Sequence, residues 1–421
     1  MAQNIASKQK TFQKPRRFFE KSGFVDPEMS FYIPLKNVVN TDKQNIQTMI
    51  DQGRYLSIFA PRQSGKTTFL EETCGQLLHD PTYVVINLSF EQTSSLTGSQ
   101  FYTLLEKAIY AQLLNRLKEV GCHKMEEVQI FLNSHRLVDH ISFTFLFERL
   151  NQIIQFKKIV IFIDEFDGIP LLELGDFLTS LRGLYQKYKK VKPKALYSVG
   201  LIGIRNITKL VVGGVSPFNI ADRVALPPFS LDNIAALYGQ YTEETNQPFT
   251  AQAIQRVYEE TAGQPWLVNR LGAILTLDIK PETIEPINNQ DVEKAIQILL
   301  QERNDHFDNL FEKAKLYKET FVEIVFDHVE YNPYDGEQSW LEQYGLIKNR
   351  DGHATVANNI YKSILVKAFS KKLMLATEET TEGYLVVFDT KTPVGVICEP
   401  QLHQVGEKKV VSVTIPIGKP E

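Results

Sequence analysis

The sequence has few cysteines and no long apolar segment. Its three cysteines, Cys74, Cys122 and Cys398, form no Cys-x-x-Cys pair, which excludes a disulfide scaffold and a zinc ribbon. No apolar run approaches the roughly 18 residues of a membrane-spanning helix, and the N-terminus lacks the apolar stretch of a secretory signal. These absences predict a protein of the reducing cytoplasm that does not cross a membrane.

A strong excess of one charge is also missing. The chain has 46 Lys+Arg and 50 Asp+Glu, a net charge of −4, so contact with nucleic acid would require a local basic patch. With 43% hydrophobic, 11% aromatic and 23% charged residues, the composition is globular and excludes wholesale disorder, collagen and low complexity. The length of 421 residues predicts two to four domains at roughly 100–200 residues each.

Residues 1–30 read as a basic N-terminal tail. Over residues 1–21, only Glu20 accompanies a series of cations, which are Lys8, Lys10, Lys14, Arg16, Arg17 and Lys21. We expect a solvated terminus; the alternative is an electrostatic arm for a phosphate backbone.

Residues 31–228 alternate apolar runs with helical stretches such as 100–120 and 143–155. Because the apolar runs are continuous, we expect strands that are covered on both faces of a parallel sheet in an α/β fold. The expected strands are Tyr55–Phe59, Tyr83–Leu88, Ile159–Ile163 and Leu196–Ile204.

The remaining chain divides into three segments. Residues 229–302 predict a small helical domain, with Ser230 and Thr250 as helix N-caps; its helices are Leu231–Glu243, Ala251–Thr261, Pro265–Leu277 and Asp291–Glu302. Residues 303–370 predict a winged helix whose hairpin turns at Asp351-Gly352; its helices are Lys318–Val329, Glu337–Tyr344 and Ile360–Phe369. Residues 371–421 predict a linker and a small β segment, in which the strand from Lys408 lies at a sheet edge.

The strongest motif is APRQSGKT at 60–67, between an expected strand and an expected helix. This context is the one that a Walker A phosphate loop requires. Gly65 allows close backbone approach, Lys66 reaches the β- and γ-phosphates, and the Thr67 hydroxyl ligates Mg²⁺. Ala60 replaces the usual first glycine. The predicted nucleotide-binding residues are Ala60, Pro61, Arg62, Gln63, Ser64, Gly65, Lys66, Thr67 and Thr68.

A second motif, KKIVIFIDEFD, ends an expected strand in Asp164-Glu165. It predicts a Walker B motif in which Asp164 joins Thr67 at Mg²⁺ and Glu165 polarises the attacking water. The predicted catalytic residues are Glu165, Lys66 and Asp164. Two further hypotheses are a sensor at Arg205 or Asn206 and an arginine finger at Arg223; each could equally be a surface residue.

Together with SPFNI (216–220) and TAGQPWLVNRL (261–271), these motifs resemble P-loop ATPases of the AAA+/STAND type. The subset that the chain resembles joins a helical lid and a winged helix to the ATPase, often with a PD-(D/E)XK nuclease-like tail. The resemblance implies that Pro265 approaches the nucleotide. It also places Phe31 or Tyr32 near the adenine, with core packing as the alternative. Here the tail is too short for a nuclease core, so we expect a remnant without nuclease activity.

The sequence thus predicts ATP binding and hydrolysis with Mg²⁺, driving or gating a conformational change in a partner or nucleic-acid complex. The alternative is a nucleotide-loaded switch or scaffold with little turnover, which recruits a partner protein or binds DNA. A protein partner or self-association is expected. Nucleic acid could bind the basic cluster at 187–194, for which a solvated loop is the default. The acidic helix near 337–345 argues against major-groove binding.

Overall fold

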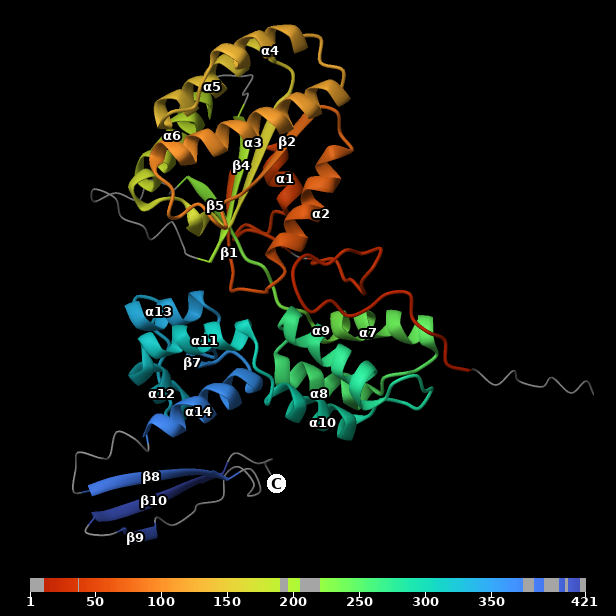
Figure 1. The fold of residues 1–421 in the computed structure, drawn as a ribbon, viewed down its shortest axis with the longest axis vertical. Coiled ribbons are helices and arrows are strands. Elements are labelled where there is room, and N and C mark those ends of the chain that lie inside the picture. The colour runs from red at the N-terminus through yellow and green to blue at the C-terminus, as the bar shows by residue number, and fades with distance from the viewer. Residues whose placement is uncertain are drawn as a thin grey trace, which may run out of the picture. The chain divides into compact units, whose positions relative to one another are not determined.

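The structure is a computed structural model that describes residues 11–36, 38–189, 196–204, 220–373, 382–389, 401–405 and 408–416 (Figure 1). The chain divides into two compact units. One comprises Met1–Leu299 with Pro333–Gly345, and the other comprises Leu300–Asn332 with Leu346–Glu421. No helix among the described residues is long and apolar enough to cross a membrane.

The first unit contains a five-stranded parallel sheet, which confirms the expected α/β fold. The strand order is β2-β3-β4-β1-β5. The strands are β1 (Tyr55–Phe59), β2 (Tyr83–Ser89), β3 (Lys158–Asp164), β4 (Leu196–Gly203) and β5 (Ala221–Val224). Sequence patterns did not predict β5, because its four residues Ala-Asp-Arg-Val contain no apolar run.

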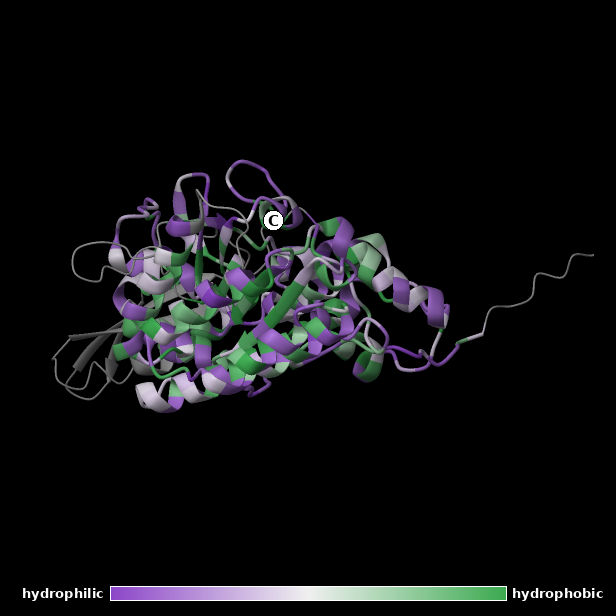
Figure 2. Ribbon diagram, turned by 90° about the horizontal axis from the view of Figure 1, so that it is seen from above, coloured by the Kyte–Doolittle hydropathy of each residue, from purple (hydrophilic) through white to green (hydrophobic). Residues whose placement is uncertain are grey.

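Helices cover both faces of this sheet (Figure 1). Val160 and Phe162 of β3 pack with α1 (Ile46–Asp51) and α2 (Lys66–Leu78), whereas Ile159, Ile161 and Ile163 pack on the opposite face. That opposite face is covered by α3 (Gly98–Glu119), α4 (Met125–Ser134), α5 (His140–Ile153) and α6 (Leu171–Lys189). Two-sided burial explains the continuous apolar runs, and Figure 2 shows a strand in the interior coloured mainly as hydrophobic.

A group of helices follows the sheet in the same unit, and we call it the lid. It consists of α7 (Leu231–Thr245), α8 (Ala251–Thr261), α9 (Pro265–Ile274) and α10 (Asn289–Leu299). Ser230 and Thr250 accept hydrogen bonds from Asn233 N and Ala253 N, so both are the N-caps that the sequence predicts. The helix expected to run from Pro265 to residue 277 instead changes to a π-helical turn at Leu275.

Most of residues 11–30 are exposed, as expected of a solvated tail, but Arg17 and Phe19 are held against α7. Phe19 is only 3% exposed and packs on Tyr238 and Tyr241 of α7. The side chain of Arg17 is paired with Glu244 of the same helix. Counting charges along the sequence missed this arrangement, because the partners of Arg17 lie more than 200 positions away.

The second unit contains α11 (Asp305–Leu316), α12 (Lys318–Phe326), the hairpin β6 (Ile347–Arg350) and β7 (His353–Val356), and α14 (Asn359–Leu373). Asp351 and Gly352 both adopt positive φ, so the predicted Asp-Gly turn is confirmed. Buried His306 and Tyr361 share a 2.7 Å hydrogen bond between α11 and α14. Helix α13 (Gly336–Gln343) belongs to the first unit by its contacts.

A separate three-stranded sheet follows in the second unit, with the order β8-β10-β9. Its strands are β8 (Glu382–Asp389), β9 (Gln401–Val405) and β10 (Lys408–Pro416). The prediction that β10 forms an edge is wrong, because β8 and β9 both pair with it. The sequence did not predict β9, the strand that makes β10 central.

Candidate nucleotide-binding site

The loop at 60–65 connects β1 directly to α2. Ala60 N donates to Gly203 O of β4 at 3.2 Å, which joins the start of the loop to the sheet. Gln63 and Gly65 have positive φ values of 58° and 86°. Gly65 is the N-cap of α2 and provides no side-chain cap. No side chain at the N-cap position therefore accepts from the first N–H groups of α2. A helix N-terminus of this kind can bind a phosphate.

Lys66 lies buried against this loop, with only 7% of its surface exposed. Its ammonium donates to Ala60 O at 2.9 Å and to Pro61 O at 2.7 Å. Burial lowers the pKa of Lys66, although the nearby carboxylates of Glu165 and Asp164 act to raise it. A cation held close to loop carbonyls and carboxylates lies where phosphate oxygens would bind a P-loop.

The two predicted metal ligands lie in contact. Thr67 Oγ1 donates to Asp164 Oδ2 at 2.9 Å, which links the start of α2 to the end of β3. Asp164 is buried, and its other carboxylate oxygen accepts from Glu165 N at 2.9 Å. Hydroxyl and carboxylate oxygens are ligands that Mg²⁺ prefers, so the residues present fit that ion.

Glu165 follows Asp164 in a left-handed backbone conformation with φ of 49°. Burial raises the pKa of its carboxyl group; Lys66 opposes this effect, and Asp164 adds to it. A carboxyl group with a raised pKa beside the phosphate loop suits a general base, since a base works best when its pKa approaches the working pH.

Asp167 is a site residue that motif matching missed. Its Oδ2 accepts from Ile204 N at 2.5 Å, just after β4, and lies close enough to Gly203 to leave no room for a Cβ there. Asp167 therefore links the turn after β3 to the end of β4. The sequence signal that could have identified it is the second aspartate of the segment DEFD at 164–167. Arg205 and Asn206, the proposed sensors, lie outside the described residues.

The lid also contacts the loop. Gln264 Nε2 donates to Gln63 O at 3.1 Å, while Gln264 Oε1 accepts from Leu267 N at 2.6 Å and caps α9. Pro265 is the first residue of α9, immediately after this contact. The sequence singled out Pro265, but the hydrogen bond to the loop comes from its neighbour.

The other predicted residues take different positions. Phe31 is 1% exposed and packs on Phe19 and Tyr241, so the core-packing alternative holds for it. The Tyr32 hydroxyl donates to Glu72 of α2. Arg223 is exposed on β5.

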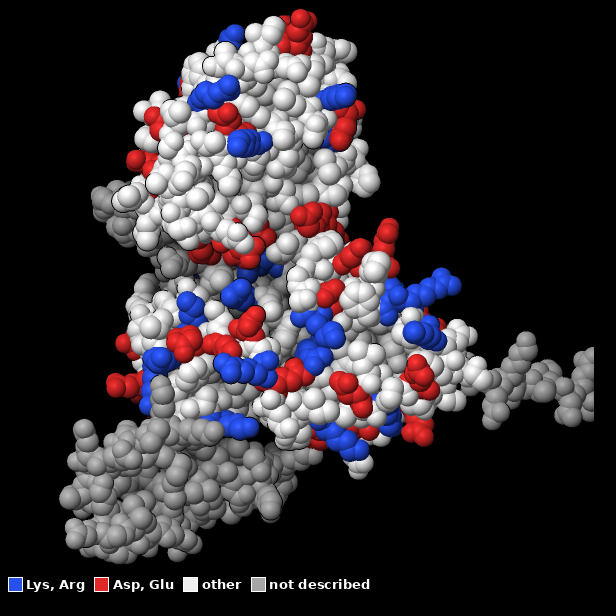
Figure 3. Space-filling model, viewed as in Figure 1, with Lys and Arg blue, Asp and Glu red and all other residues white. Residues whose placement is uncertain are grey.

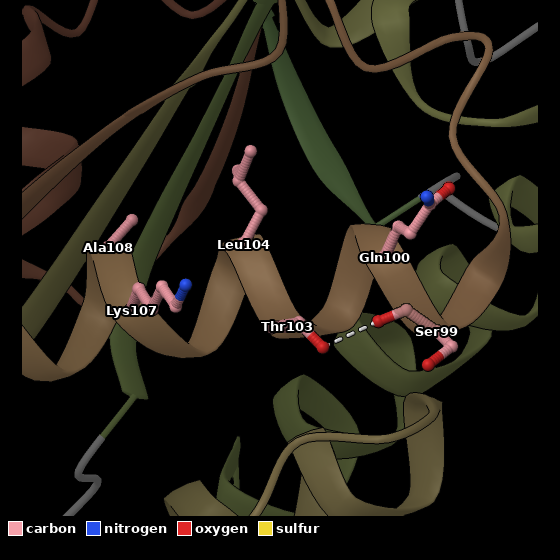
Figure 4. Close-up of a pocket in the computed structure, with 6 residues that line it drawn as sticks. All are labelled: Ser99, Gln100, Thr103, Leu104, Lys107 and Ala108. Carbon is pink, nitrogen blue, oxygen red and sulfur yellow. Dashed lines mark hydrogen bonds between the residues drawn. The ribbon is translucent and has the colours of Figure 1, made fainter.

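The basic cluster proposed for nucleic acid and a surface pocket are two further regions of the first unit. Lys187 pairs with Glu148, and the rest of the basic cluster at 190–194 lies outside the described residues. A surface pocket lies along α3, with Leu104 and Lys107 among its lining residues (Figure 4). It shares no described residue with the loop. In the described part of the chain, no group of three or more His, Cys, Asp or Glu side chains converges on a metal position.

A parallel sheet whose first strand enters a glycine-containing loop, and whose β3 ends beside that loop in an acidic pair, defines a P-loop ATPase fold. Residues 20–367 match the family described as the AAA-like domain, and the chain belongs to that family.

One solved structure, that of a Walker-type ATPase, agrees with this fold. The Walker-type ATPase of Pyrococcus abyssi is 12% identical, with a TM-score of 0.51 over 80% of this chain and 99% of that chain. The ORC2 protein of Aeropyrum pernix is 13% identical, with a TM-score of 0.43 over 86% of this chain and 100% of that chain. Human Anoctamin-5 is 23% identical over 278 residues, which are 63% of this chain and 28% of Anoctamin-5. The chain thus spans less than a third of that curated relative.

Proposed function

We propose that this chain binds ATP with Mg²⁺ at the loop 60–68 and hydrolyses it. The observation that carries the proposal is the 2.9 Å hydrogen bond between Thr67 and Asp164, since it brings the Walker A and Walker B motifs together. Lys66 and Glu165 lie close enough for each charge to shift the pKa of the other. A phosphate-binding cation, an oxygen ligand pair and a base are the components that phosphoryl transfer needs.

The residues divide the steps of binding and hydrolysis among them in this proposal. The N–H groups at the start of α2 and the Lys66 ammonium bind the β- and γ-phosphates. Thr67 and Asp164 hold Mg²⁺, which neutralises charge on the phosphates when bound. Glu165 orients the attacking water and accepts its proton. Gln264 and Pro265 bring the lid to the loop, so that nucleotide state biases lid position.

We propose that hydrolysis drives or gates a conformational change in a partner, which is another protein or a second copy of this chain, within the cytoplasm. Segment 303–370 would act as a winged helix that docks on protein, because α13 carries Glu337 and Glu342, which repel phosphate backbones. On the face drawn in Figure 3, basic and acidic side chains are interspersed, which favours protein over nucleic acid. The second candidate function is a slow switch with little turnover, and the carboxyl group of Glu165 directly after Asp164 favours turnover over it.

Two substitutions test the proposal. Lys66→Ala should abolish binding of ATP with Mg²⁺ in calorimetry, because it removes the main positive charge at the phosphates. Glu165→Gln should retain binding but slow phosphate release by about 10²–10⁴-fold, the usual contribution of a positioned base.

Matched controls are available on the same unit. Lys107→Ala and Glu91→Gln change exposed residues outside the loop and should leave binding and turnover unchanged. If Lys66→Ala binds ATP with the same affinity as the parent, the loop at 60–68 is not the nucleotide-binding site. A parent protein that binds ATP without turnover would instead support the switch.

A further inference from the structure

Arg17 attaches the N-terminal arm, residues 11–36, to helix α7. Its Nε donates to Glu244 Oε1 at 2.7 Å, and its Nη1 donates to Gln240 Oε1 at 2.9 Å. Glu244 Oε2 accepts from the backbone N of Arg16 and of Arg17 at 2.8 and 3.2 Å. Glu244 therefore binds the arm with both carboxylate oxygens. Although burial opposes it, these bonds hold the pKa of Glu244 below its usual value.

Aromatic packing strengthens this attachment. The Phe19 ring lies 4.8 Å from the Phe31 ring and 5.5 Å from the Tyr238 ring, centroid to centroid. On the other side, Phe19 lies so close to Gly272 of α9 that a Cβ there would meet the ring at 2.9 Å. Phe19 thus fills the space between α7 and α9. Trp266 of α9 adds a hydrogen bond from its Nε1 to Lys21 O at 2.8 Å.

The same arm also contacts α2, the helix that follows the loop at 60–65. Val25 N donates to Thr68 Oγ1 at 3.2 Å, and the Tyr32 hydroxyl donates to Glu72. The backbone of Tyr32 pairs in both directions with the side chain of Gln240, at 3.2 and 2.7 Å. Gln240 is therefore bound by Arg17 and by Tyr32 at once. Thr68 belongs to the segment 60–68 that is proposed to bind ATP, directly after Lys66 and Thr67.

We propose that residues 11–36 act as a strap that fastens the lid to α2 and thereby slows nucleotide release. The nucleotide part of this inference rests on the proposed function. A lid that opens away from α2 has to break one of two sets of contacts. The first set joins Arg17, Phe19, Lys21 and the Tyr32 backbone to α7 and α9, and the second joins Val25 and the Tyr32 hydroxyl to α2. Release of product through such an opening is a common slow step in ATPases with a lid.

The test compares Arg17→Met with Arg16→Met in the full chain. Both variants lose one positive charge from the same arm, but the Arg16 side chain is exposed, and substitution leaves its backbone N–H in place. Hydrogen exchange without nucleotide should become about tenfold faster in Arg17→Met for peptides of the arm and α7, as loss of charge-assisted hydrogen bonds predicts. Dissociation of a fluorescent ATP analogue with Mg²⁺ should accelerate by a similar factor. Arg16→Met should match the parent in both measurements.

Tyr32→Phe provides a second, milder variant. It removes only the bond to Glu72, so exchange in α7 should stay as in the parent while dissociation accelerates severalfold. Unchanged exchange in Arg17→Met, or equal effects in both arginine variants, would overturn the strap. Faster exchange with unchanged dissociation would overturn its control of nucleotide release. A parent that binds no ATP would refute the proposed function, and exchange would still decide whether the strap exists.

Discussion

At the scale of single residues, Gln264 performs two tasks with two different atoms. Its carbonyl oxygen caps α9 at Leu267 N, and its amide nitrogen donates to Gln63 O of the Walker A loop. The cap stabilises helix α9 of the lid. The amide donor forms the contact between the lid and the loop at 60–65. Because the atoms differ, one substitution can remove the second task and keep the first.

Gln264→Glu is that substitution. A carboxylate still accepts from Leu267 N, but it cannot donate and it faces the Gln63 carbonyl. We expect the free energy of unfolding to stay close to that of the parent and ATP affinity to fall about threefold to tenfold, since one hydrogen bond contributes roughly 0.5–1.5 kcal/mol. Calorimetric titration measures this. Gln252→Glu, on the exposed side of α8, adds the same charge to the lid and should change nothing. Equal affinity in both variants would show that the contact has no role.

At the scale of elements, two glycines of the lid stand in opposite surroundings. Gly263, between α8 and α9, has φ of 74°, and a Cβ there would lie 1.9 Å from Phe229 O. Gly239 lies inside α7, and a Cβ there would meet nothing within 4 Å. The first glycine is required by its backbone and its neighbour. The second only weakens its helix.

These surroundings predict opposite effects of one substitution. Gly263→Ala should destabilise the protein by about 1–3 kcal/mol, because the backbone between the helices has to shift. Gly239→Ala should stabilise it by about 0.5–1 kcal/mol, because alanine favours a helix interior. Urea unfolding of both variants measures the two free energies. A stabilised Gly263→Ala would contradict the close approach to Phe229.

Local signals explain which elements could be predicted from the sequence. β1 and α8 match their predicted bounds, because an apolar run or an amphipathic repeat with an N-cap encodes each one. β5 and β9 were missed, since each is defined by pairing with a distant strand and not by its own pattern. Helices α4 and α11 were also missed.

The same limit applies to the site. Lys66, Thr67 and Asp164 could be found because their motifs have fixed spacing, and the structure places Thr67 and Asp164 together. The contact of Gln264 with Gln63 joins residues 201 positions apart, and no motif reports it. The arm was misread for the same reason, because the positive charge of Arg17 is balanced by Glu244 far along the chain.

At the scale of the whole molecule, the five-stranded and the three-stranded sheet share no strand. β1 to β5 pair only with one another, and β8 to β10 form their own sheet in the second unit. Within the described strands, β8 and β9 each have one neighbour and so end the smaller sheet. End strands of this kind present backbone donors and acceptors that can pair with another chain.

Truncation after Leu373 tests the role of the smaller sheet. It removes β8 to β10 together and takes no strand partner from β1 to β5. ATP affinity should therefore equal that of the full chain, because every residue proposed to bind nucleotide remains. Self-association should weaken, since the two end strands are gone. Calorimetry measures the affinity, and sedimentation over a concentration series measures association. Loss of ATP binding would show that the smaller sheet supports the nucleotide site, and unchanged association would mean that its end strands pair with no second copy.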